Sequence, residues 1–432
     1  MAERYPVLVT LYLALSRLAG PILKLVHAYR CSSGKDDPAR GSEKFGLSSL
    51  ARPSEAPVWI HAASVGEAAS VLPLIERLCA AGNTVLLTTV TRTSAELASR
   101  QLPDGAIHQY APFDSPLYWL RFLSFWQPKL ALTVESEVWP ACYVALRERS
   151  IPFCIVNGRM SERSFKGWSR LTAAARFIFA IPDLVLAQSS GDADRFKRLG
   201  ARSVAEPGNL KFDARPENPE PETLAALRGM LHDRPRWLAA LTHPGEDEIA
   251  LEAHLELLKE TPDLLLMLVP RHPVRGDEIA RLAEGRGLVV ARRSRGDEIG
   301  PDTQVYLGDT LGEMGLFYSL SGVCFLGGSF TDVGGHNPVE AANFETAIVS
   351  GPKVANARTV YRALWDTGGA TKVSEAKELP GEVARLLSDD RGHSASIAAA
   401  SGVVAGGQGA LERTLELLSP YLAPSAQADR ET

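Results

Sequence analysis

The sequence Gly327-Gly-Ser-Phe-Thr-Asp-Val-Gly-Gly-His-Asn-Pro-Val-Glu340 follows an apolar segment with the pattern of a buried strand. We predict a helix from about Asn337, so this stretch is a glycine-rich turn between a strand and a helix. Its two glycine pairs let the backbone approach a ligand closely, and the amides at a helix N-terminus attract an anion such as a phosphate. Glu340, one turn into the helix, can accept hydrogen bonds from ribose hydroxyls. The alternative interpretation is a glycine-rich turn without a ligand.

Apolar strand-like segments alternate with helical segments on both sides of this turn. In the first half, strands are predicted at 58–62, 84–89, 130–134, 153–157 and 184–187, with helices such as 68–80, 140–149 and 192–199. In the second half, strands are predicted at 237–241, 264–269, 305–307, 323–326 and 347–350, with helices such as 246–259 and 310–318. This alternation is typical of parallel sheets with helices on both faces.

A proline-rich, acidic segment at 213–222 has no periodicity and is typical of a linker between domains. We therefore predict an α/β protein with two doubly wound, Rossmann-like domains, at 31–213 and 223–422, after an N-terminal helix at 1–30. Two such domains place ligands at the carboxyl ends of strands that face an interdomain cleft. The tail at 424–432 is expected to be frayed.

Composition narrows the classes of protein and partner. The chain has 432 residues, of which 45% are hydrophobic and 22% charged, so it is globular and long enough for two domains. Its formal net charge of -5 gives no support to a nucleic-acid partner. The five cysteines are widely scattered, so neither a disulfide framework nor a zinc site is indicated, and a reducing compartment is expected.

The N-terminal segment 5–29 is rich in leucine and aromatic residues. Arg17 and Lys24 interrupt the apolar run, which is shorter than the roughly 20 residues of a spanning helix, and the interior charges and Pro21 disfavour a signal peptide. Basic residues among and after the leucines suit a helix at an anionic cytoplasmic leaflet; those that follow are Arg30, Lys35, Arg40 and Lys44. The alternative is an ordinary amphipathic core helix.

Acidic and basic residues follow several predicted strands of the first domain. Glu67 lies at the start of a helix, where a carboxylate is stabilised as the anion, so it is a candidate base towards a hydroxyl; a capping carboxylate is the alternative. Glu135 and Glu137 end another strand and invite a metal or acid–base interpretation. Divalent metals need more oxygen ligands than these, so we expect no metal. Lys211 precedes the linker and is expected to point into the cleft.

In the second domain, Arg271 and His272 end a strongly apolar strand. Arginine makes bidentate contacts with phosphate, whereas Lys211 supplies a point charge. Singly, such residues are more often surface ion pairs; together at strand ends they suggest an anionic donor. The sequence 308–313 precedes another helix, whose amides are expected to join the same pocket.

Six motifs in order along the chain resemble the 3-deoxy-D-manno-octulosonic acid (Kdo) transferases of lipopolysaccharide assembly. The motifs are His61-Ala-Ala-Ser-Val-Gly-Glu67, Glu135-Ser-Glu-Val-Trp-Pro140, Gly208-Asn-Leu-Lys-Phe-Asp213, Pro270-Arg-His272, Gly308-Asp-Thr-Leu-Gly-Glu313 and Gly334-Gly-His-Asn-Pro-Val-Glu340. The resemblance implies a GT-B glycosyltransferase that moves Kdo from CMP-Kdo to the primary hydroxyl of a lipid A precursor (lipid IVA). It further implies action at the cytoplasmic face of the inner membrane of a Gram-negative bacterium, in contact with membrane lipids, with no metal or cofactor.

The resemblance also implies roles for individual residues. Glu67 corresponds to the general base in the acceptor-binding N-terminal domain, and Glu135 and Lys211 correspond to groups that support the transition state. The CMP-binding positions of the donor-binding C-terminal domain correspond to Pro270, Arg271, Leu311, Gly312, Glu313, Asn337, Pro338, Val339 and Glu340. We add His272 to this set because it shares the strand end of Arg271.

Two other functions remain open from the sequence. A GT-B epimerase, or a transferase with a different nucleotide-sugar donor, would share the glycine-rich loop and Glu340 but would not explain the apolar N-terminus. A nucleotide-binding regulator without catalytic activity would bind CMP and turn over no lipid acceptor.

Overall fold

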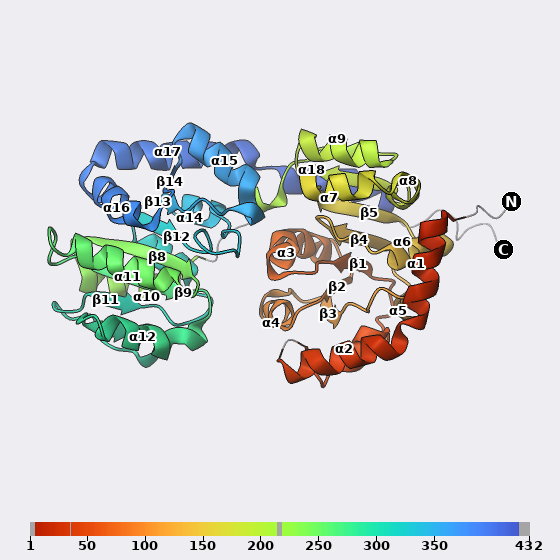
Figure 1. Cartoon of the computed structure of the whole chain (residues 1–432), viewed down its shortest axis with the longest axis horizontal. Helices are drawn as coiled ribbons and strands as arrows, with labels where there is room; N and C mark the ends of the chain where they lie inside the picture. Colours follow the sequence, from red (N-terminus) through yellow and green to blue (C-terminus); the bar gives the residue numbers. More distant parts are fainter. Residues whose placement is uncertain (1–4, 35, 214–217, 423–432) are drawn as a thin grey trace. The chain divides into compact units, whose positions relative to one another are not determined.

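The computed structural model describes residues 5–34, 36–213 and 218–422. The chain forms two compact units, one from Met1–Ala214 with Gln408–Thr432 and the other from Arg215–Gly407 (Figure 1). The sequence-based boundaries differ from this division at one end, because they assigned residues 408–422 to the second domain. Part of the predicted linker, 214–217, and the predicted frayed tail, 424–432, lie outside the described residues.

The sheet of the first unit is entirely parallel, with strand order β3-β2-β1-β4-β5-β6-β7. Its strands are β1 (Val58–His61), β2 (Val85–Thr89), β3 (Ala106–Tyr110), β4 (Leu130–Val134), β5 (Phe153–Gly158), β6 (Leu184–Ala187) and β7 (Val204–Ala205). Strand β1 pairs with β2 on one side and with β4 on the other, so the order of connection reverses there. At such a switch point the loops after adjacent strands diverge and leave room for a ligand.

Helices cover both faces of this sheet because side chains alternate along its strands. Val58 and Ile60 of β1 pack with α3 (Val65–Ala80), α4 (Arg92–Gln101) and α18 (Ala410–Leu422), whereas Trp59 packs in a separate core on the other face. That second core includes side chains from α5 (Pro116–Trp126), α6 (Pro140–Glu148), α7 (Glu162–Ser169), α8 (Thr172–Phe179) and α9 (Ser190–Leu199).

Helix α18 belongs to the first unit through both apolar and polar contacts. Ala410 and Leu418 are fully buried in the core that contains Val58 and Ile60. The carboxylate of Asp213 accepts hydrogen bonds from the backbone N–H groups of Gly409 and Leu411, each at 2.7 Å. The start of α18 is therefore fixed to Asp213, the first residue of the predicted linker.

The N-terminal segment forms two helices instead of the single predicted one. Helices α1 (Val7–Leu18) and α2 (Gly20–Ser32) meet at an angle of 63° next to Pro21, whose ring nitrogen has no hydrogen to donate to a continuous helix. Within the described residues no single helix is long and apolar enough to cross a membrane, although the bent pair together reaches that length and composition. Helix α1 rests on α5, α6 and α8.

The basic residues from Arg30 onward do not all face outward as the sequence suggested. Lys44 is buried and donates to the carbonyl of Val90 at 2.7 Å, and burial lowers its pKa to about 8. Arg40 binds the buried Glu43 and Arg30 binds the buried Asp36, each at 2.9 Å. Arg30, Arg40 and Lys44 thus satisfy buried polar groups. Arg17 lies on α1, Lys24 and Arg30 lie on α2, and Lys35 lies outside the described residues.

The sheet of the second unit is also parallel, with strand order β10-β11-β9-β8-β12-β13-β14. Its strands are β8 (Arg236–Thr242), β9 (Leu265–Pro270), β10 (Val290–Arg292), β11 (Val305–Leu307), β12 (Val323–Leu326), β13 (Ala347–Ser350) and β14 (Ala370–Lys372). Here β8 lies between β9 and β12 at the switch point.

Helices cover both faces of this sheet as well. The core around Trp237 and Phe325 includes side chains from α11 (Glu246–Leu257), α12 (Gly276–Glu284) and α16 (Leu379–Ser388). On the other face lie α13 (Met314–Leu320), α14 (Val339–Asn343), α15 (Arg358–Thr367) and α17 (Asp390–Gly407), and α10 (Pro221–Leu231) packs on α13. The predicted pair of doubly wound parallel sheets is therefore confirmed, whereas the cleft between the domains stays a prediction.

The strands that the sequence pattern did not predict are β3, β7, β10 and β14, which form the four sheet edges. Edge strands are short and partly exposed, so their apolar pattern is weak. Two helices also start later than predicted. Helix α13 starts at Met314, after Gly312 with its positive φ of 81°, and α14 starts at Val339, after Pro338.

Candidate active site

Glu67 is held at the carboxyl end of β1, in the first turn of α3. Its carboxylate accepts hydrogen bonds from the backbone N–H of Ala63 at 2.8 Å and from the Ser64 hydroxyl at 2.9 Å. The Ser64 oxygen in turn accepts from the Glu67 N–H at 3.3 Å and caps the helix. The Glu67 carboxylate therefore stabilises the turn before α3, as the capping alternative proposed. Both groups that donate to it, the Ala63 N–H and the Ser64 hydroxyl, precede the first residue of the helix.

The electrostatic environment of Glu67 differs from the sequence-based expectation of a stabilised anion. The pKa of Glu67 is raised to about 7, first by burial and then by the carboxylates of Glu137 and Glu135, although the hydrogen bonds from Ala63 and Ser64 lower it. Desolvation and like charge both disfavour the ionised form, and here they outweigh the helix N-terminus. The result is a carboxyl group that exchanges its proton near neutral pH.

Glu135 and Lys211 form an ion pair, with Lys211 Nζ 2.6 Å from Glu135 Oε1. Glu135 ends β4 in the left-handed region at φ 57°, a strained conformation for a residue with a side chain, and it is largely buried. Lys211 lies in the short 3-10 turn η2 (Leu210–Phe212), whose first N–H is accepted by the Asn157 side chain at 3.0 Å. Two residues 76 positions apart are thus brought together by the ends of β4 and β5.

Glu137 and His61 lie beside this pair. Glu137 accepts from the Trp139 indole N–H at 2.6 Å, and burial and Glu135 raise its pKa. His61 Nε2 lies 4.0 Å from Glu137 Oε2, and burial lowers the pKa of His61 to about 3, so the imidazole is neutral. Glu67, Glu135, Glu137, Lys211 and His61 form one group at the switch point of the first sheet, which we call the acidic site.

In the second unit, the ends of β9 and β11 border a small cavity of about 90 Å³. Five of the predicted donor residues line it, namely Pro270, Arg271, Leu311, Gly312 and Glu313. The rest of its wall is formed by Leu241, Val269, Thr310, Met314 and Phe317. We call this cavity the donor pocket, because its lining residues come from two motifs that were predicted to bind the donor.

The remaining predicted donor residues lie in different surroundings. Arg271 lies close enough to Glu340 for the carboxylate to raise its pKa, against a larger lowering by burial. His272 is exposed at the same strand end, with its ring 6.0 Å from that of His243. Asn337 accepts from the Val339 N–H at 3.3 Å, and Pro338 and Val339 are buried. The side chain of Val339 is therefore not accessible to a ligand.

Three residues that support the donor side were not predicted from the sequence. Glu246 is fully buried and accepts from the N–H groups of His243, Gly328 and Phe330 at 3.0, 2.6 and 2.9 Å. His243 Nε2 lies 3.0 Å from His336 Nε2. In the sequence, Glu246 and His243 could have been found from Thr242-His-Pro-Gly-Glu246. This turn directly follows the central strand β8, at the position where α/β sheets bind ligands.

Arg293, in the turn η4 (Arg293–Arg295), is the third unpredicted residue. Its guanidinium binds the Glu313 carboxylate at 2.6 Å, and Thr310 donates to the same carboxylate. Arg293 thereby holds the loop that forms one wall of the donor pocket. No sequence pattern marks it, because its partner lies 20 residues away.

Among residues 5–34, 36–213 and 218–422, no group of three or more His, Cys, Asp or Glu side chains has a geometry that could hold a metal ion. Metal independence of the reaction stays a prediction.

Comparison with known proteins finds relatives along most of the chain. A family model described as 3-deoxy-D-manno-octulosonic-acid transferase (kdotransferase) matches residues 39–214. The 3-deoxy-D-manno-octulosonic acid transferase of Haemophilus influenzae is 36% identical over 390 residues, which cover 89% of this chain and 91% of that protein. The Bordetella pertussis protein of the same name is 36% identical and covers 86% and 88% of the two chains.

A solved structure extends the comparison to the whole fold. The S. aureus MnaA–UDP co-structure superposes with a TM-score of 0.58 at 16% identity, covering 85% of this chain and 97% of that chain. At this identity the likeness concerns the fold alone, and it confirms the GT-B architecture of two parallel-sheet domains.

The raised pKa of Glu67 predicts a specific pH dependence of stability. Between its ordinary value of 4.5 and about 7, the folded chain holds a proton at this site that the unfolded chain has lost. The contribution to stability is therefore complete below pH 4.5 and lost as the pH rises through about 7. Glu67→Gln has no such titration, so the stability of the wild type relative to this variant should fall across that window.

Urea unfolding at several pH values measures this difference. Glu76→Gln, at an exposed position of the same helix, is the matched control and should follow the wild-type profile. Parallel profiles for the wild type and Glu67→Gln would contradict the assignment.

Proposed function

This chain belongs to the 3-deoxy-D-manno-octulosonic acid (Kdo) transferase family, and we propose that it moves Kdo from CMP-Kdo to the primary hydroxyl of a lipid A precursor (lipid IVA), with Glu67 as general base. The relatives are named as transferases, so the chain is a glycosyltransferase. The donor, the acceptor and the residue roles are the proposed part. The observation that supports them best is the carboxyl group of Glu67, which titrates near neutral pH at the switch point of the first sheet.

Glu67 would act on the acceptor hydroxyl. The carboxylate takes the hydroxyl proton while the oxygen forms a bond to the anomeric carbon of Kdo. The bond between that carbon and the phosphate oxygen of CMP breaks, and CMP leaves with the electron pair. A base works best when its pKa lies near the working pH, and the pKa of about 7 at Glu67 meets this condition.

Lys211 and Glu135 would support the charge that develops during this step. A lysine ammonium has three N–H donors, and Glu135 uses one of them at 2.6 Å. The other two are available for an anionic group of the substrates. The ion pair also offsets part of the negative charge around Glu67, which moderates the repulsion from Glu135 and Glu137.

The donor pocket, with a volume of about 90 Å³, would hold only the base of the nucleotide. Its partly apolar walls suit a pyrimidine base, with Pro270, Leu311, Gly312 and Glu313 around it. Arg271 would contact the phosphate and Glu340 the ribose, because Arg271 follows β9 and Glu340, in the first turn of α14, is near enough to raise the pKa of Arg271. Asn337 and Pro338 end the loop after β12, Val339 starts α14, and His272 is exposed beside Arg271 after β9. Neither metal nor cofactor enters this scheme.

The N-terminal helix pair would place the protein at the cytoplasmic face of the inner membrane of a Gram-negative bacterium. Apolar side chains are exposed along both helices, at Val7, Leu8, Leu11, Leu15, Leu18, Ile22, Leu25 and Tyr29. Arg17 and Lys24 lie among them and suit anionic headgroups. Such a surface would keep the enzyme beside a lipid acceptor.

The direct test is incubation with CMP-Kdo and a tetraacylated disaccharide lipid A precursor, with product mass as the readout. We expect a mass increase by one or more Kdo units, unchanged by a metal chelator. Absence of product would overturn the proposed substrates. The same assay with UDP-linked sugars tests the alternative of a different nucleotide-sugar donor.

Glu67→Gln tests the role of the base. The amide keeps the size of the side chain and one acceptor for Ala63, but it cannot take a proton. Turnover should fall by about 10²- to 10⁴-fold, the usual contribution of a positioned base, while CMP affinity stays near the wild-type value. A fully active variant would remove Glu67 from the mechanism, and a loss that only follows the melting temperature would leave it as a capping group.

Arg271→Ala tests the donor site. Loss of a charge-assisted hydrogen bond to phosphate should weaken CMP binding by about 1.5–3 kcal/mol, measured by calorimetry. Arg281→Ala, an exposed arginine of α12 outside the pocket lining, is the control and should bind CMP normally. Unchanged affinity in Arg271→Ala would place the nucleotide elsewhere.

Membrane attachment is testable without removing the helices. Deletion of residues 1–29 would also remove structural contacts, because Val9 is buried and the Tyr12 hydroxyl donates to Asp114 at 2.7 Å. We therefore expect the combined variant Leu11→Ser, Leu15→Ser and Leu25→Ser to keep its melting temperature and lose sedimentation with vesicles of anionic phospholipid. Val274→Ser, at an exposed apolar residue of the second unit, should still sediment. Full sedimentation of the triple variant would assign the attachment to another surface.

A further inference from the structure

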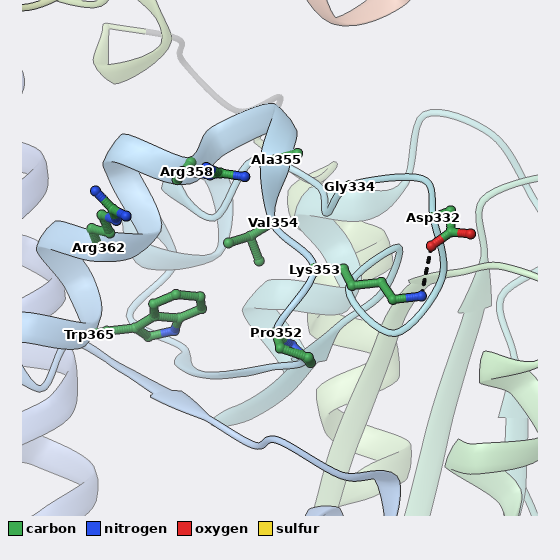
Figure 2. A pocket seen from close by; sticks show the side chains of 9 residues that line it. All are labelled: Asp332, Gly334, Pro352, Lys353, Val354, Ala355, Arg358, Arg362 and Trp365. Carbon is green, nitrogen blue, oxygen red and sulfur yellow. Dashed lines mark hydrogen bonds and ion pairs between the residues drawn. The ribbon is translucent and has the colours of Figure 1, made fainter. Parts of the chain in front are cut away.

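The second unit has a larger pocket that shares no lining residue with the donor pocket. Its volume is about 480 Å³, and it lies between the glycine-rich loop, the segment after β13 and one side of α15 (Figure 2). We call it the basic pocket. Its walls are Asp332 and Gly334 of the loop, Pro352 to Ala355 after the strand, and Arg358, Arg362 and Trp365 of the helix.

Positive charge dominates this pocket. Lys353, Arg358 and Arg362 line it, against a single carboxylate at Asp332 that binds Lys353 at 2.7 Å. Arg358 and Arg362 are one helical turn apart, so they lie on the same side of α15. Within the described part of the chain, neither arginine has an ion pair with a carboxylate. Two arginines with no acidic partner are suited to bidentate contacts with a phosphate group.

The same side of α15 also supplies a fixed aromatic surface. Trp365 is seven residues after Arg358, and its indole N–H donates to the Ser350 hydroxyl at 3.3 Å. Lys372 Nζ lies 5.2 Å from the centre of its ring. In Figure 2 the indole lies below the two arginines, with the buried Val354 and with Pro352 beside it. A flat indole with apolar neighbours is suited to the apolar face of a sugar ring.

We propose that the basic pocket binds a phosphorylated sugar, with Arg358 and Arg362 on the phosphate and Trp365 against the ring. The volume supports a ligand of this size, because it lies in the range of small-molecule sites, roughly 300–1,000 Å³, and exceeds the need of a free phosphate. The sugar phosphate is either a soluble metabolite or the headgroup of a glycolipid, since both present the same chemistry.

The pocket is coupled to the glycine-rich loop through its rim. Lys353 N–H donates to the carbonyl of Ser329 at 2.9 Å, and Asn356 donates from its backbone to Gly334 and from its side chain to Val333, each at 2.8 Å. A ligand in the basic pocket would therefore contact Asp332 and Gly334 of the loop that leads to Asn337 and Glu340. The site is distinct from the nucleotide contacts, so CMP affinity serves as an independent control.

The test is calorimetric titration of the full-length protein with glucosamine 6-phosphate, glucosamine and inorganic phosphate. Glucosamine 6-phosphate should bind the wild type more tightly than either fragment. Combined Arg358→Ala and Arg362→Ala substitutions, at exposed positions, should raise its Kd by roughly tenfold or more, the effect of losing a charge-assisted hydrogen bond. Trp365→Leu should weaken glucosamine 6-phosphate but leave inorganic phosphate unchanged.

Arg281→Ala, on the α12 side of the same sheet, is the matched charge control and should retain wild-type Kd values. CMP affinity should stay constant in all variants, so a failure here is distinguishable from failure of the proposed transferase substrates.

Phosphatidylcholine vesicles that carry a phosphorylated glucosamine lipid form the second arm. Competition by these vesicles identifies a glycolipid headgroup, and its absence identifies a soluble sugar phosphate. Equal binding of glucosamine 6-phosphate by the wild type and the double variant would overturn the proposal, as would equal binding of inorganic phosphate and glucosamine 6-phosphate by the wild type.

Discussion

The second unit depends on one buried carboxylate, that of Glu246, which accepts three backbone N–H groups at the switch point of its sheet. A fully buried charge is costly unless hydrogen bonds replace its hydration, and here they come from the turn after β8 and the loop after β12. The two connections are therefore locked to each other. Gly327 shows how closely they approach, because a Cβ there would lie 2.6 Å from the carbonyl oxygen of Leu241.

The first unit uses a carboxylate at the equivalent position for a different purpose. Glu67 also accepts hydrogen bonds at a switch point, but it is only half-buried and two further carboxylates act on it. Glu246 is saturated by donors and fixes the backbone, whereas Glu67 is kept from full ionisation at neutral pH. The two carboxylates behave differently because of their neighbours. Glu246 is surrounded by N–H donors, whereas Glu67 lies near the carboxylates of Glu135 and Glu137.

The N-terminal helix α1 is attached to the first unit on one side only. Helix α1 is attached through Val9 and through Tyr12, whose hydroxyl reaches Asp114 at 2.7 Å, and Asp114 also accepts from the N–H groups of Ala141 and Cys142 at the start of α6. The remaining leucines stay exposed. The core-helix alternative describes the side of α1 that packs on the first unit, whereas the membrane-surface hypothesis for the exposed side stays a prediction.

The amino-acid sequence by itself determined the alternation of strands and helices, the two parallel sheets, the family and the strand-end positions of residues such as Glu67, Lys211 and Arg271. These features are local, since an apolar strand and the turn after it are encoded in consecutive residues. Tertiary structure alone decided the short edge strands, the return of α18 to the first unit, and the pairing of Lys211 with Glu135. It also decided the pKa of Glu67, the anchoring of the loop by Glu246, and the basic pocket beside α15. Each of these depends on burial or charge contributed by residues distant in the chain, and no local pattern carries that information.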